Sequence, residues 1–429
     1  MSPVVAVFDI DLSPGVAFMR SLGRAGVPVV AMSSRRTAAG RYSRFHDELR
    51  SCPPLKRTDE FVDWLSQELE RGSFDLVAPT SDYVSFCTAE AIEKLGGDAR
   101  DAGQPDPDGL RTCLFKDRFA VAMANVGFPT PATAAPVTAA EAQASAAEIG
   151  YPVVLKPRSH AGIGTTRGTV VRTPEALATR FRPYRIPEGS TSVTRHDPDL
   201  ALPIVQRYHE LGTVDVVSVS GCLDRSGAVL ALSHSRKVSQ SPRRLGVGTM
   251  FEPLPHQPYT DAAVDAVRQL LGSGIFELEV LVDRRTGEFW AVDLNPRGFG
   301  QMTLDMALGD DLPVLWYRSV TGEDVPTAPA RRSRPLYWHD AVASYLGFAV
   351  RFVRGPHRSA IAGHAKGRVL SPSVGSMFDR GDPLPGVIFG LGHFRHPRAI
   401  VRPFLVDTEL RDTNDDLDLG VRPCRNAPG

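Results

Sequence analysis

The sequence predicts an α/β and α+β protein, in which a parallel-sheet domain at the N-terminus precedes a larger part rich in antiparallel strands. The chain opens with a βαβ alternation, made of apolar residues 4–8, a helix-like stretch over 14–24 and a second apolar run over 27–32. Residues 151–171 have the pattern of a strand, a glycine-bearing loop and another strand, and residues 275–297 have that of an antiparallel hairpin.

The first domain is predicted to hold a small parallel sheet. A helical pattern covers residues 60–70, and residues 75–79 form a buried strand that ends at the loop Thr-Ser-Asp. In such sheets ligands gather outside the carboxyl ends of the strands. These ends lie here around Asp9 to Ser13 and Thr80 to Asp82.

A helix-like stretch over 117–125 ends at Gly127, and the proline-containing segment FPTPAT follows as an extended linker. We place a domain boundary there. Further strands are expected over 203–208, 214–220 and 228–233, and a helix over 260–271. The expected organisation is an N-terminal α/β domain (1–128), a small subdomain with the glycine loop (129–212), a large subdomain with a metal site (213–325) and a C-terminal extension with a disordered acidic tail (326–429).

Composition excludes several classes of protein. A chain of 429 residues is too long for one core, and its 49 basic and 49 acidic side chains leave no electrostatic footprint for nucleic acid. No apolar run approaches the roughly 20 residues that span a bilayer, and the N-terminus lacks a secretory pattern. We therefore expect a cytoplasmic protein with no membrane span. The cysteines are too scattered for a zinc site or a disulfide scaffold: Cys52, Cys87, Cys113, Cys222 and Cys424.

The predicted hairpin carries a set of oxygen ligands. Residues two apart on a strand share a face, so Glu277 and Glu279 project together, as do Asp293 and Asn295. Pairing of the two strands would bring Glu279 opposite the second pair, and Mg²⁺ prefers such oxygens. The alternative is a solvated polar face on an edge hairpin, which the mostly apolar run around Asp293 disfavours.

Cationic residues form a second pattern. Lys156 ends an apolar strand just before a loop with three glycines, and such a loop lets backbone N–H groups approach a polyphosphate. The loop alone is a weak signal, because many hairpins are rich in glycine. Arg236 and Lys237 follow another strand, and their alternative reading is an ordinary surface pair. The loop glycines are Gly162, Gly164 and Gly168.

Taken in order, these motifs resemble the ATP-grasp superfamily over roughly residues 1–322. The resemblance implies a pre-ATP-grasp domain followed by a two-subdomain ATP-grasp fold. It implies phosphate contacts from Lys116 in LFKDRFAVAMANVGFPTPAT, from Lys156 in YPVVLKP, and from Arg236 or Lys237. The segment PIVQRYHELG resembles the adenine hinge, which would add Gln206 and Tyr208 to the nucleotide site, and Asp215 falls where a ribose-binding acid is expected.

The Asn-Pro-Arg motif carries the rest of the resemblance. It implies magnesium ligation by Glu279, Asp293 and Asn295, with an aspartate where the family commonly has a longer glutamate. Arg297 would bind the acyl phosphate or the substrate carboxylate, and the loop over 159–167 would act as a lid. The segment ALGDDLPVLWYRSVTG resembles those that close this domain in carboxylate and amine ligases.

The implied activity is that of a carboxylate-amine ligase that uses ATP and Mg²⁺, with Mn²⁺ as an alternative ion. A carboxylate would be activated as an acyl phosphate and joined to an amine, with an amino acid as a candidate substrate. A homodimer is a reasonable default. Three alternatives stay open: a thiol or bicarbonate as substrate, a non-catalytic nucleotide-binding protein, and a membrane-surface role for YLGFAVRFV and GVIFGLGHF, which packing on the body explains equally well.

Overall fold

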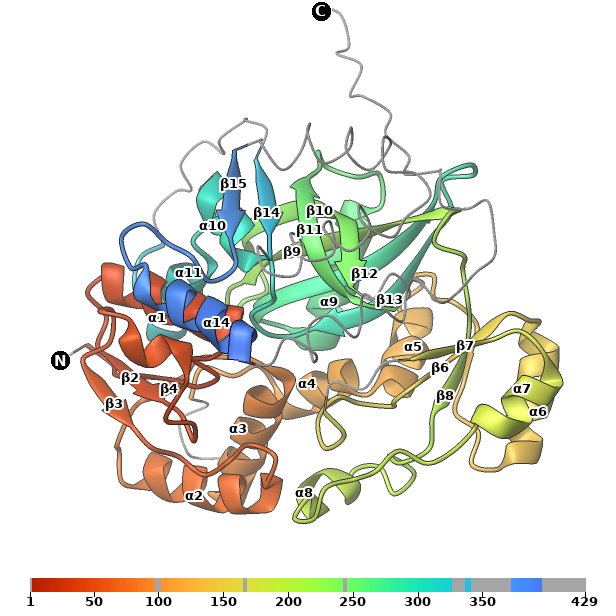
Figure 1. The fold of residues 1–429 in the computed structure, drawn as a ribbon, viewed down its shortest axis with the longest axis horizontal. Helices are drawn as coiled ribbons and strands as arrows, with labels where there is room; N and C mark the ends of the chain where they lie inside the picture. Colours follow the sequence, from red (N-terminus) through yellow and green to blue (C-terminus); the bar gives the residue numbers. More distant parts are fainter. Residues whose placement is uncertain are drawn as a thin grey trace, which may run out of the picture.

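The computed structural model describes residues 2–96, 102–164, 168–241, 245–325, 336–340 and 372–395. Three sheets form its framework (Figure 1). A four-stranded sheet near the N-terminus lies at one end of the molecule, a second four-stranded sheet lies at the other end, and a seven-stranded sheet lies between and above them. The mixture of a parallel N-terminal sheet and antiparallel sheets confirms the predicted fold class.

The N-terminal sheet is parallel throughout, in the order β3-β2-β1-β4. Its first strand is buried on both faces: Val5 and Val7 pack into one hydrophobic core, and Ala6 and Phe8 pack into another. This burial explains why the strand is a continuous apolar run. The elements are β1 (Val5–Val7), α1 (Ser13–Arg24), β2 (Val29–Met32), η1 (Ala39–Tyr42), β3 (Glu48–Arg50), α2 (Thr58–Glu70), β4 (Leu76–Val77) and α3 (Asp82–Lys94).

Two short helices, α4 (Pro107–Leu114) and α5 (Lys116–Asn125), lead into the second sheet, which has the order β5-β8-β6-β7 and antiparallel pairs throughout. Helices α6 and α7 pack against its apolar side chains. The elements of this part are β5 (Thr133–Ala134), α6 (Ala139–Ile149), β6 (Val153–Lys156), β7 (Thr169–Val171), α7 (Pro174–Arg180), α8 (Thr191–Thr194) and β8 (Ile204–Arg207).

The large sheet has the order β13-β12-β9-β10-β11-β14-β15. The expected strand over 228–233 is longer in the structure, because its polar second half pairs with β11 rather than following an apolar pattern. The elements are β9 (Val214–Leu223), β10 (Val229–Ser241), β11 (Val247–Pro253), α9 (Thr260–Leu271), β12 (Gly274–Asp283), β13 (Phe289–Asn295), α10 (Met302–Leu308), α11 (Leu312–Thr321), β14 (Tyr337–His339) and β15 (Ser373–Gly375).

Part of the C-terminal region is built into this body. Strands β14 and β15 extend the large sheet, and α14 (Leu384–Arg395) lies beside η1 and α1 (Figure 1). Asp382, just before α14, accepts a 2.9 Å bond from Arg20 Nε, and both side chains are buried. The domain boundaries drawn from the sequence stay predictions.

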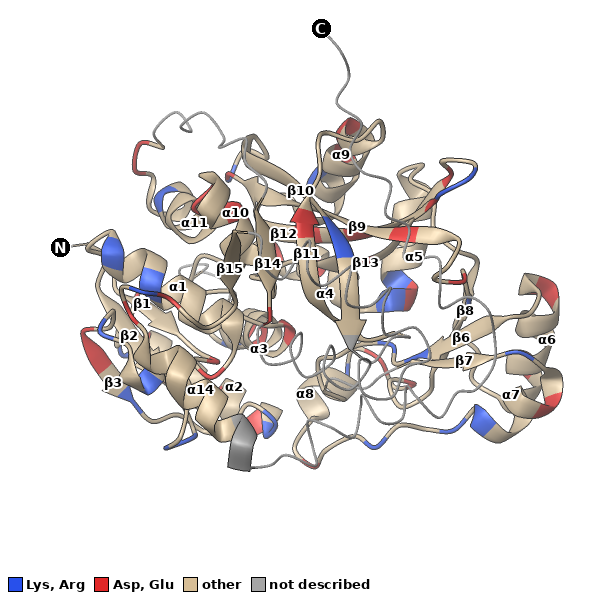
Figure 2. Ribbon diagram, turned by 45° about the horizontal axis from the view of Figure 1, so that its top comes forward, with Lys and Arg blue, Asp and Glu red and all other residues tan. Residues whose placement is uncertain are grey.

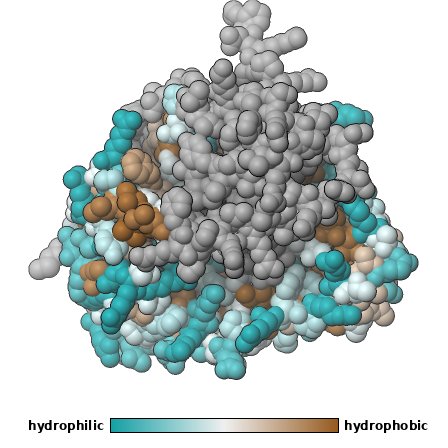
Figure 3. All heavy atoms as spheres, in the orientation of Figure 1, coloured by the Kyte–Doolittle hydropathy of each residue, from teal (hydrophilic) through white to brown (hydrophobic). Residues whose placement is uncertain are grey.

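Helix α14 contains the segment GVIFGLGHF. Ile388 and Phe389 pack toward Val16, Ala39 and Met377. Leu384, Val387 and Leu391 are exposed. Figure 3 shows an apolar patch on the side of the molecule where α14 lies. Packing on the body therefore accounts for one side of this helix. YLGFAVRFV and the acidic tail lie outside the described residues. Within the described ranges, every helix is too short or too polar to cross a membrane.

Candidate active site

The hairpin of β12 and β13 has the register that the sequence predicts. Glu279 lies opposite Asp293, and Glu277 lies opposite Asn295, so their side chains share one face of the large sheet. The turn that fixes this register is closed by Asp283, whose Oδ1 accepts bonds of 2.8 Å from the backbone N–H groups of Arg285 and Thr286. The predicted set of oxygen ligands is therefore assembled.

Lysines from three separate elements converge near these oxygens. Lys116 Nζ, at the start of α5, lies 2.5 Å from Asp293 Oδ1. Lys237 Nζ, on β10, lies 2.7 Å from Glu279 Oε1. Lys156 Nζ, at the end of β6, lies 2.9 Å from Gln206 Oε1. Figure 2 shows acidic and basic positions side by side on the central strands of the large sheet. Sequence-distant residues thus form one cluster, which we call the lysine–carboxylate cluster: Lys116, Lys156, Lys237, Glu279 and Asp293.

The charges in this cluster act strongly on one another. Burial opposes the charged form of Asp293, but Lys116, His160 and Lys156 outweigh it and lower the pKa of Asp293 to about 2. Burial and the neighbouring charge of Lys116 lower the pKa of Lys156 to about 8, despite the opposing effect of the two carboxylates. Lys156 is therefore held less firmly in its charged form than an ordinary lysine.

A buried acid supports the amide of the Asn-Pro-Arg motif. Glu277 accepts bonds from Ser218 Oγ (2.7 Å), from Asn295 Nδ2 (3.1 Å) and from Gln301. Burial, with the nearby charge of Glu279, raises the pKa of Glu277. The contact with Nδ2 orients the Asn295 amide so that its oxygen faces Arg297. Sequence reasoning missed Ser218 and Gln301. The serines at alternate positions of β9 could have indicated a polar face on this strand.

Arg297 joins the large sheet to the N-terminal domain. Its Nη2 lies 2.7 Å from Asn295 Oδ1, and its Nε lies 2.7 Å from Asp82 Oδ1 at the start of α3. The next residue, Gly298, donates its N–H to Pro79 O at 2.7 Å, which docks the loop on the end of β4. The carboxyl-end loop expected to gather ligands is thus in contact with the Asn-Pro-Arg arginine.

The structure separates Arg236 from Lys237. Adjacent residues on a strand point to opposite faces, and Arg236 points to the face that α9 covers. It donates to Glu252 Oε1 at 2.8 Å through Nε and approaches Asp215 Oδ2 at 3.6 Å. Of the two cations the sequence offered, Lys237 is the one in the cluster. The sequence analysis expected a phosphate contact from Arg236 or Lys237. Because neighbouring side chains on a strand point to opposite faces, only Lys237 can face the carboxylates.

The hinge residues have different surroundings. Gln206 links Lys156 to Thr133, which accepts a 2.8 Å bond from Gln206 Nε2. Tyr208 follows β8 with a buried ring. Asp215 is bound by Arg284 at 3.0 Å, in addition to its contact with Arg236, so its contacts differ from those of the cluster. The structure brings Gln206 to the cluster and leaves Asp215 on the other face.

The glycine loop adopts backbone conformations that favour glycine. Gly162 and Gly164 have φ of +84° and +83°, and a Cβ at Gly162 would lie 3.0 Å from Val193. His160, which the sequence reasoning missed, bridges back to Gly164 O at 3.2 Å. Residues 165–167 of the expected lid lie outside the described part of the chain. Gly168 starts the return to β7 and lies close to Leu155 O.

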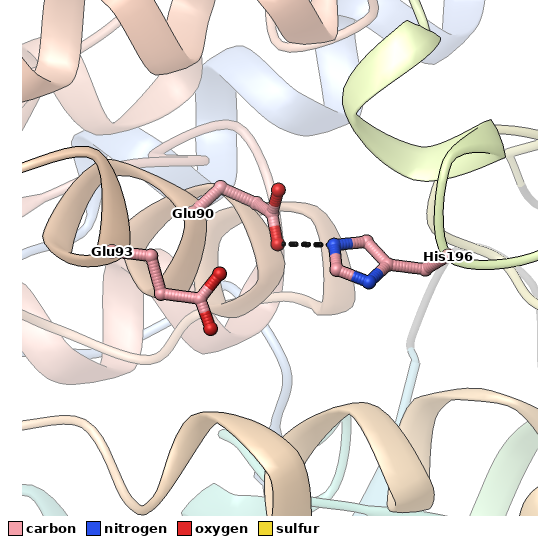
Figure 4. A group of neighbouring side chains, drawn as sticks. All are labelled: Glu90, Glu93 and His196. Carbon is pink, nitrogen blue, oxygen red and sulfur yellow. Dashed lines mark hydrogen bonds and ion pairs between the residues drawn. The ribbon is translucent and has the colours of Figure 1, made fainter.

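A second group of residues that could bind a metal lies between α3 and the segment after α8 (Figure 4). The ligand atoms of Glu90, Glu93 and His196 lie within 4.8 Å of one another, which is close enough to hold a metal ion. Glu90 is however also bound by Arg111 Nη1 at 3.1 Å and by Arg195. Two guanidinium groups therefore balance the charge of the Glu90 carboxylate without a metal ion. These contacts join α3 to the segment that follows α8.

Comparisons with known proteins give a consistent result. Residues 116–188 match the family model of the carbamoyl-phosphate synthase L chain, ATP binding domain. The chain is 24% identical over 342 residues to the mitochondrial methylcrotonoyl-CoA carboxylase subunit alpha of Oryza sativa subsp. japonica, an alignment that covers 75% of this chain and 43% of that protein. The chain thus spans less than half the length of the related sequences it matches.

Two solved structures have similar folds. Biotin carboxylase from Campylobacter jejuni superimposes with a TM-score of 0.59 at 16% identity, covering 77% of this chain and 74% of that one. N5-carboxyaminoimidazole synthetase from Staphylococcus aureus gives a TM-score of 0.59 at 12% identity, covering 83% and 87%. At these identities the similarity establishes the fold, and the resemblance found in the motifs is confirmed at that level.

Proposed function

Because the chain has the ATP-grasp fold, we propose that it is an ATP- and Mg²⁺-dependent ligase that phosphorylates a carboxylate and couples the acyl phosphate to an amine, with release of ADP and phosphate. The observation that carries this proposal is the lysine–carboxylate cluster. Oxygen ligands suited to a divalent cation lie within bonding distance of cations suited to phosphate.

Binding of MgATP would change the partners of the charged side chains in the cluster. Glu279 and Asp293 are each paired with a lysine, and each side chain is 24% exposed, so both remain accessible. Bound Mg²⁺ supplies positive charge to the carboxylates and to the phosphate oxygens, and the phosphates supply negative charge to the lysines. Replacing internal pairs with these contacts keeps every charge compensated.

The residue roles follow from this exchange. Glu279, Asp293 and the oxygen of Asn295 would hold the ion. Lys116, Lys156 and Lys237 would bind the polyphosphate. Gln206 and Tyr208, with the backbone of the hinge, would contact the nucleoside, and Asp215 would reach the ribose only by releasing Arg284 or Arg236.

Arg297 is placed to act on the reacting carboxylate. Its pKa is raised, since Asp82 and other acids outweigh the effect of burial, so its charge is secure throughout the reaction. In-line transfer of a phosphoryl group needs positioning and charge compensation more than covalent participation by the protein. A guanidinium beside the acyl phosphate would stabilise the oxyanion that forms when the nucleophile adds.

The test is a trapping assay with purified protein, ATP, Mg²⁺ and a matrix of carboxylic acids that includes amino acids and bicarbonate. Hydroxylamine, a neutral nucleophile at pH 7.5, captures an acyl phosphate as a hydroxamate, and ADP is measured in parallel. We expect ADP and hydroxamate to form in equal amounts with one class of carboxylate. ATP binding with no carboxylate-dependent ADP would instead support a non-catalytic nucleotide-binding protein.

The nucleophile is tested in the same assay. Hydroxylamine is replaced by ammonium chloride, by amino acids and by coenzyme A as a thiol. A thiol product would exclude the amine, and activity with bicarbonate would define the activated acid as a carboxyl phosphate.

A further inference from the structure

Asp9 has a backbone conformation that few residues other than glycine adopt. It lies at the carboxyl end of β1 with a φ of +51°, a region that aspartate tolerates better than most residues. The start of α1 packs directly on it: a Cβ at Gly15 would lie 2.5 Å from Asp9 O and 2.6 Å from Phe8 O. Residues held in such conformations by their surroundings are concentrated at functional sites.

The carboxylate of Asp9 is oriented by a neutral donor. Its Oδ2 accepts a 2.5 Å bond from Ser81 Oγ, and Ser81 also accepts a bond from Val84 N as the N-cap of α3. Burial raises the pKa of Asp9 to about 6, with the Ser81 bond opposing and Asp11 adding to the shift. The group is therefore ionised at neutral pH and is more basic than an ordinary aspartate.

A short series of contacts connects Asp9 to the lysine–carboxylate cluster. Ser81 precedes Asp82, which is bound by Arg297, and Arg297 is bound in turn by Asn295. Arg297 also acts electrostatically on Asp9. Asp9 thus lies on the N-terminal-domain side of the residue proposed to hold the acyl phosphate.

The other carboxylates at this edge have cationic partners. Asp82 is bound by Arg297 at 2.7 Å, and Asp11 is bound by Arg35 at 2.8 Å. Among the contacts of the described residues, Asp9 has a hydroxyl as its hydrogen-bond donor and no cation within salt-bridge distance. Asp9 as a whole residue is partly exposed among the described residues, although burial is sufficient to raise the pKa of its carboxyl group.

We propose that Asp9 binds the ammonium group of the amine substrate and accepts its proton. The inference rests on the proposed ligase activity and specifies the class of acceptor: a primary amine that is protonated in solution. An ammonium ion is not a nucleophile, so the site needs a carboxylate that recognises the cation and a base that frees its lone pair. Asp9 would serve as both.

The reaction balances with the groups named. The ammonium group gives one proton to the Asp9 carboxylate, and the neutral amine attacks the carbonyl carbon of the acyl phosphate. The C–N bond forms, the bond between carbon and the phosphate oxygen breaks, and the second amine proton leaves with the departing phosphate as hydrogen phosphate. Asp9 then returns its proton to solvent.

The test compares Asp9→Asn with the wild-type protein, using hydroxylamine and the ammonium-bearing amine that the wild-type protein couples. Asparagine has the same shape and tolerates the same φ, so the backbone should be retained. We expect kcat/KM for the protonated amine to fall about a hundredfold, a typical loss for a general base, and hydroxamate formation to stay within about twofold. Hydroxylamine needs no such base, because it is already neutral.

Asp11→Asn is the matched control, since it removes a carboxylate two residues away whose partner is the exposed Arg35. At pH 7.5, where Asp9 is ionised in both proteins, we expect this variant to couple amine at nearly the wild-type rate, although loss of the Asp11 charge lowers the pKa of Asp9. In the wild-type protein, kcat/KM for the amine should increase through an ionisation near pH 6, and the Asp9→Asn variant should not show that step.

Three outcomes would overturn the role of Asp9. One is equal loss of amine coupling and hydroxamate formation in Asp9→Asn, which would indicate a structural effect. Another is unchanged amine coupling in that variant. The third is a wild-type protein that forms hydroxamate but couples no ammonium-bearing amine, a result that would leave the activation step intact. Absence of hydroxamate with every carboxylate would instead contradict the proposed function as a whole.

Discussion

The lysine–carboxylate cluster and the group around Glu90 contain similar chemistry but differ in how their charges are held. In the first, lysines pair with Glu279 and Asp293, and each of these acids is 24% exposed. In the second, arginines and His196 surround Glu90, whose side chain is completely buried. Lysine is a compact charge on a flexible stem, whereas the guanidinium group forms a fixed fork. The first arrangement can exchange partners with a ligand, and the second is suited to holding two segments together.

Among the variants that test this difference, Asp293→Asn should have the largest effect on activity. Loss of one metal-binding charge should lower kcat about a thousandfold, in the range seen when a preorganised electrostatic contact is removed. The unfolding midpoint should fall only modestly, because Asp293 is partly exposed although Lys116 loses its partner. Steady-state ADP release and thermal unfolding measure the two quantities.

Asp283→Asn is the control for that variant, because it changes the same hairpin at its exposed turn. It should lower the unfolding temperature slightly and preserve activity. Near-normal ADP release by Asp293→Asn with its substrates supplied would remove the metal assignment.

The next effect concerns the stability of the second group. Glu90→Gln should lower the free energy of unfolding by about 3 kcal/mol, because Arg111 and Arg195 would lose a buried partner. Activity at low temperature should be retained. Chemical denaturation monitored by fluorescence measures the loss.

Glu93→Gln provides the comparison on the same helix, since the Glu93 side chain is 37% exposed. Its effect should be below about 1 kcal/mol. If both variants were equally stable, the description of this group as an attachment between two segments would be wrong.

A smaller effect is expected from Lys156→Ala. Loss of a charge-assisted contact to phosphate should weaken binding of a non-hydrolysable ATP analogue about thirtyfold, or roughly 2 kcal/mol. AMP, which lacks the β- and γ-phosphates, serves as the control ligand and should bind with similar affinity to both proteins. Titration calorimetry measures both ligands. Equal weakening for AMP would place the lysine at the nucleoside instead.

The smallest effect is a proton linkage at the same residue. The pKa of Lys156 is about 8 in the folded protein and 10.5 in its ordinary state, so between these values the unfolded chain binds more protons. The contribution of this residue to folding stability therefore improves as pH rises from about 8 to 10.5. Phosphate binding favours the charged form and should draw in a fraction of a proton at pH 8.5.

Calorimetry in buffers of different ionisation enthalpy measures that uptake. The Lys156→Ala variant should show less of it. Proton release by the wild-type protein would contradict the sign of the linkage.

Sequence patterns predicted the site where the relevant interactions are local. Alternation along two strands and a four-residue turn were sufficient to predict that Glu279 faces Asp293, and the structure has this register. Lys156 could be identified because it ends an apolar strand beside a glycine loop. By contrast, the choice between Arg236 and Lys237 depended on which face of β10 is covered by α9, and this is a tertiary property.

The remaining misses also have physical causes. His160 approaches Asp293 only after separate parts of the chain have packed together, and no local pattern marks it. Asp82 lies in the strand-end loop that was expected to gather ligands, but its pairing with Arg297 depends on tertiary packing. The second half of β10 is polar and is held by backbone pairing, so its length was underestimated. Strands β14 and β15 have three residues each, which is too short for periodicity to be detected.

The buried ion pair between Arg20 and Asp382 has a consequence for biosynthesis. Arg20 emerges from the ribosome hundreds of residues before its partner, and a guanidinium group buried without a counter-charge is costly. Helix α1 can reach its final packing only when the chain has been translated beyond Asp382. A premature stop before Asp382 should therefore leave the region around α1 incompletely packed, with a surface that chaperones and proteases can recognise.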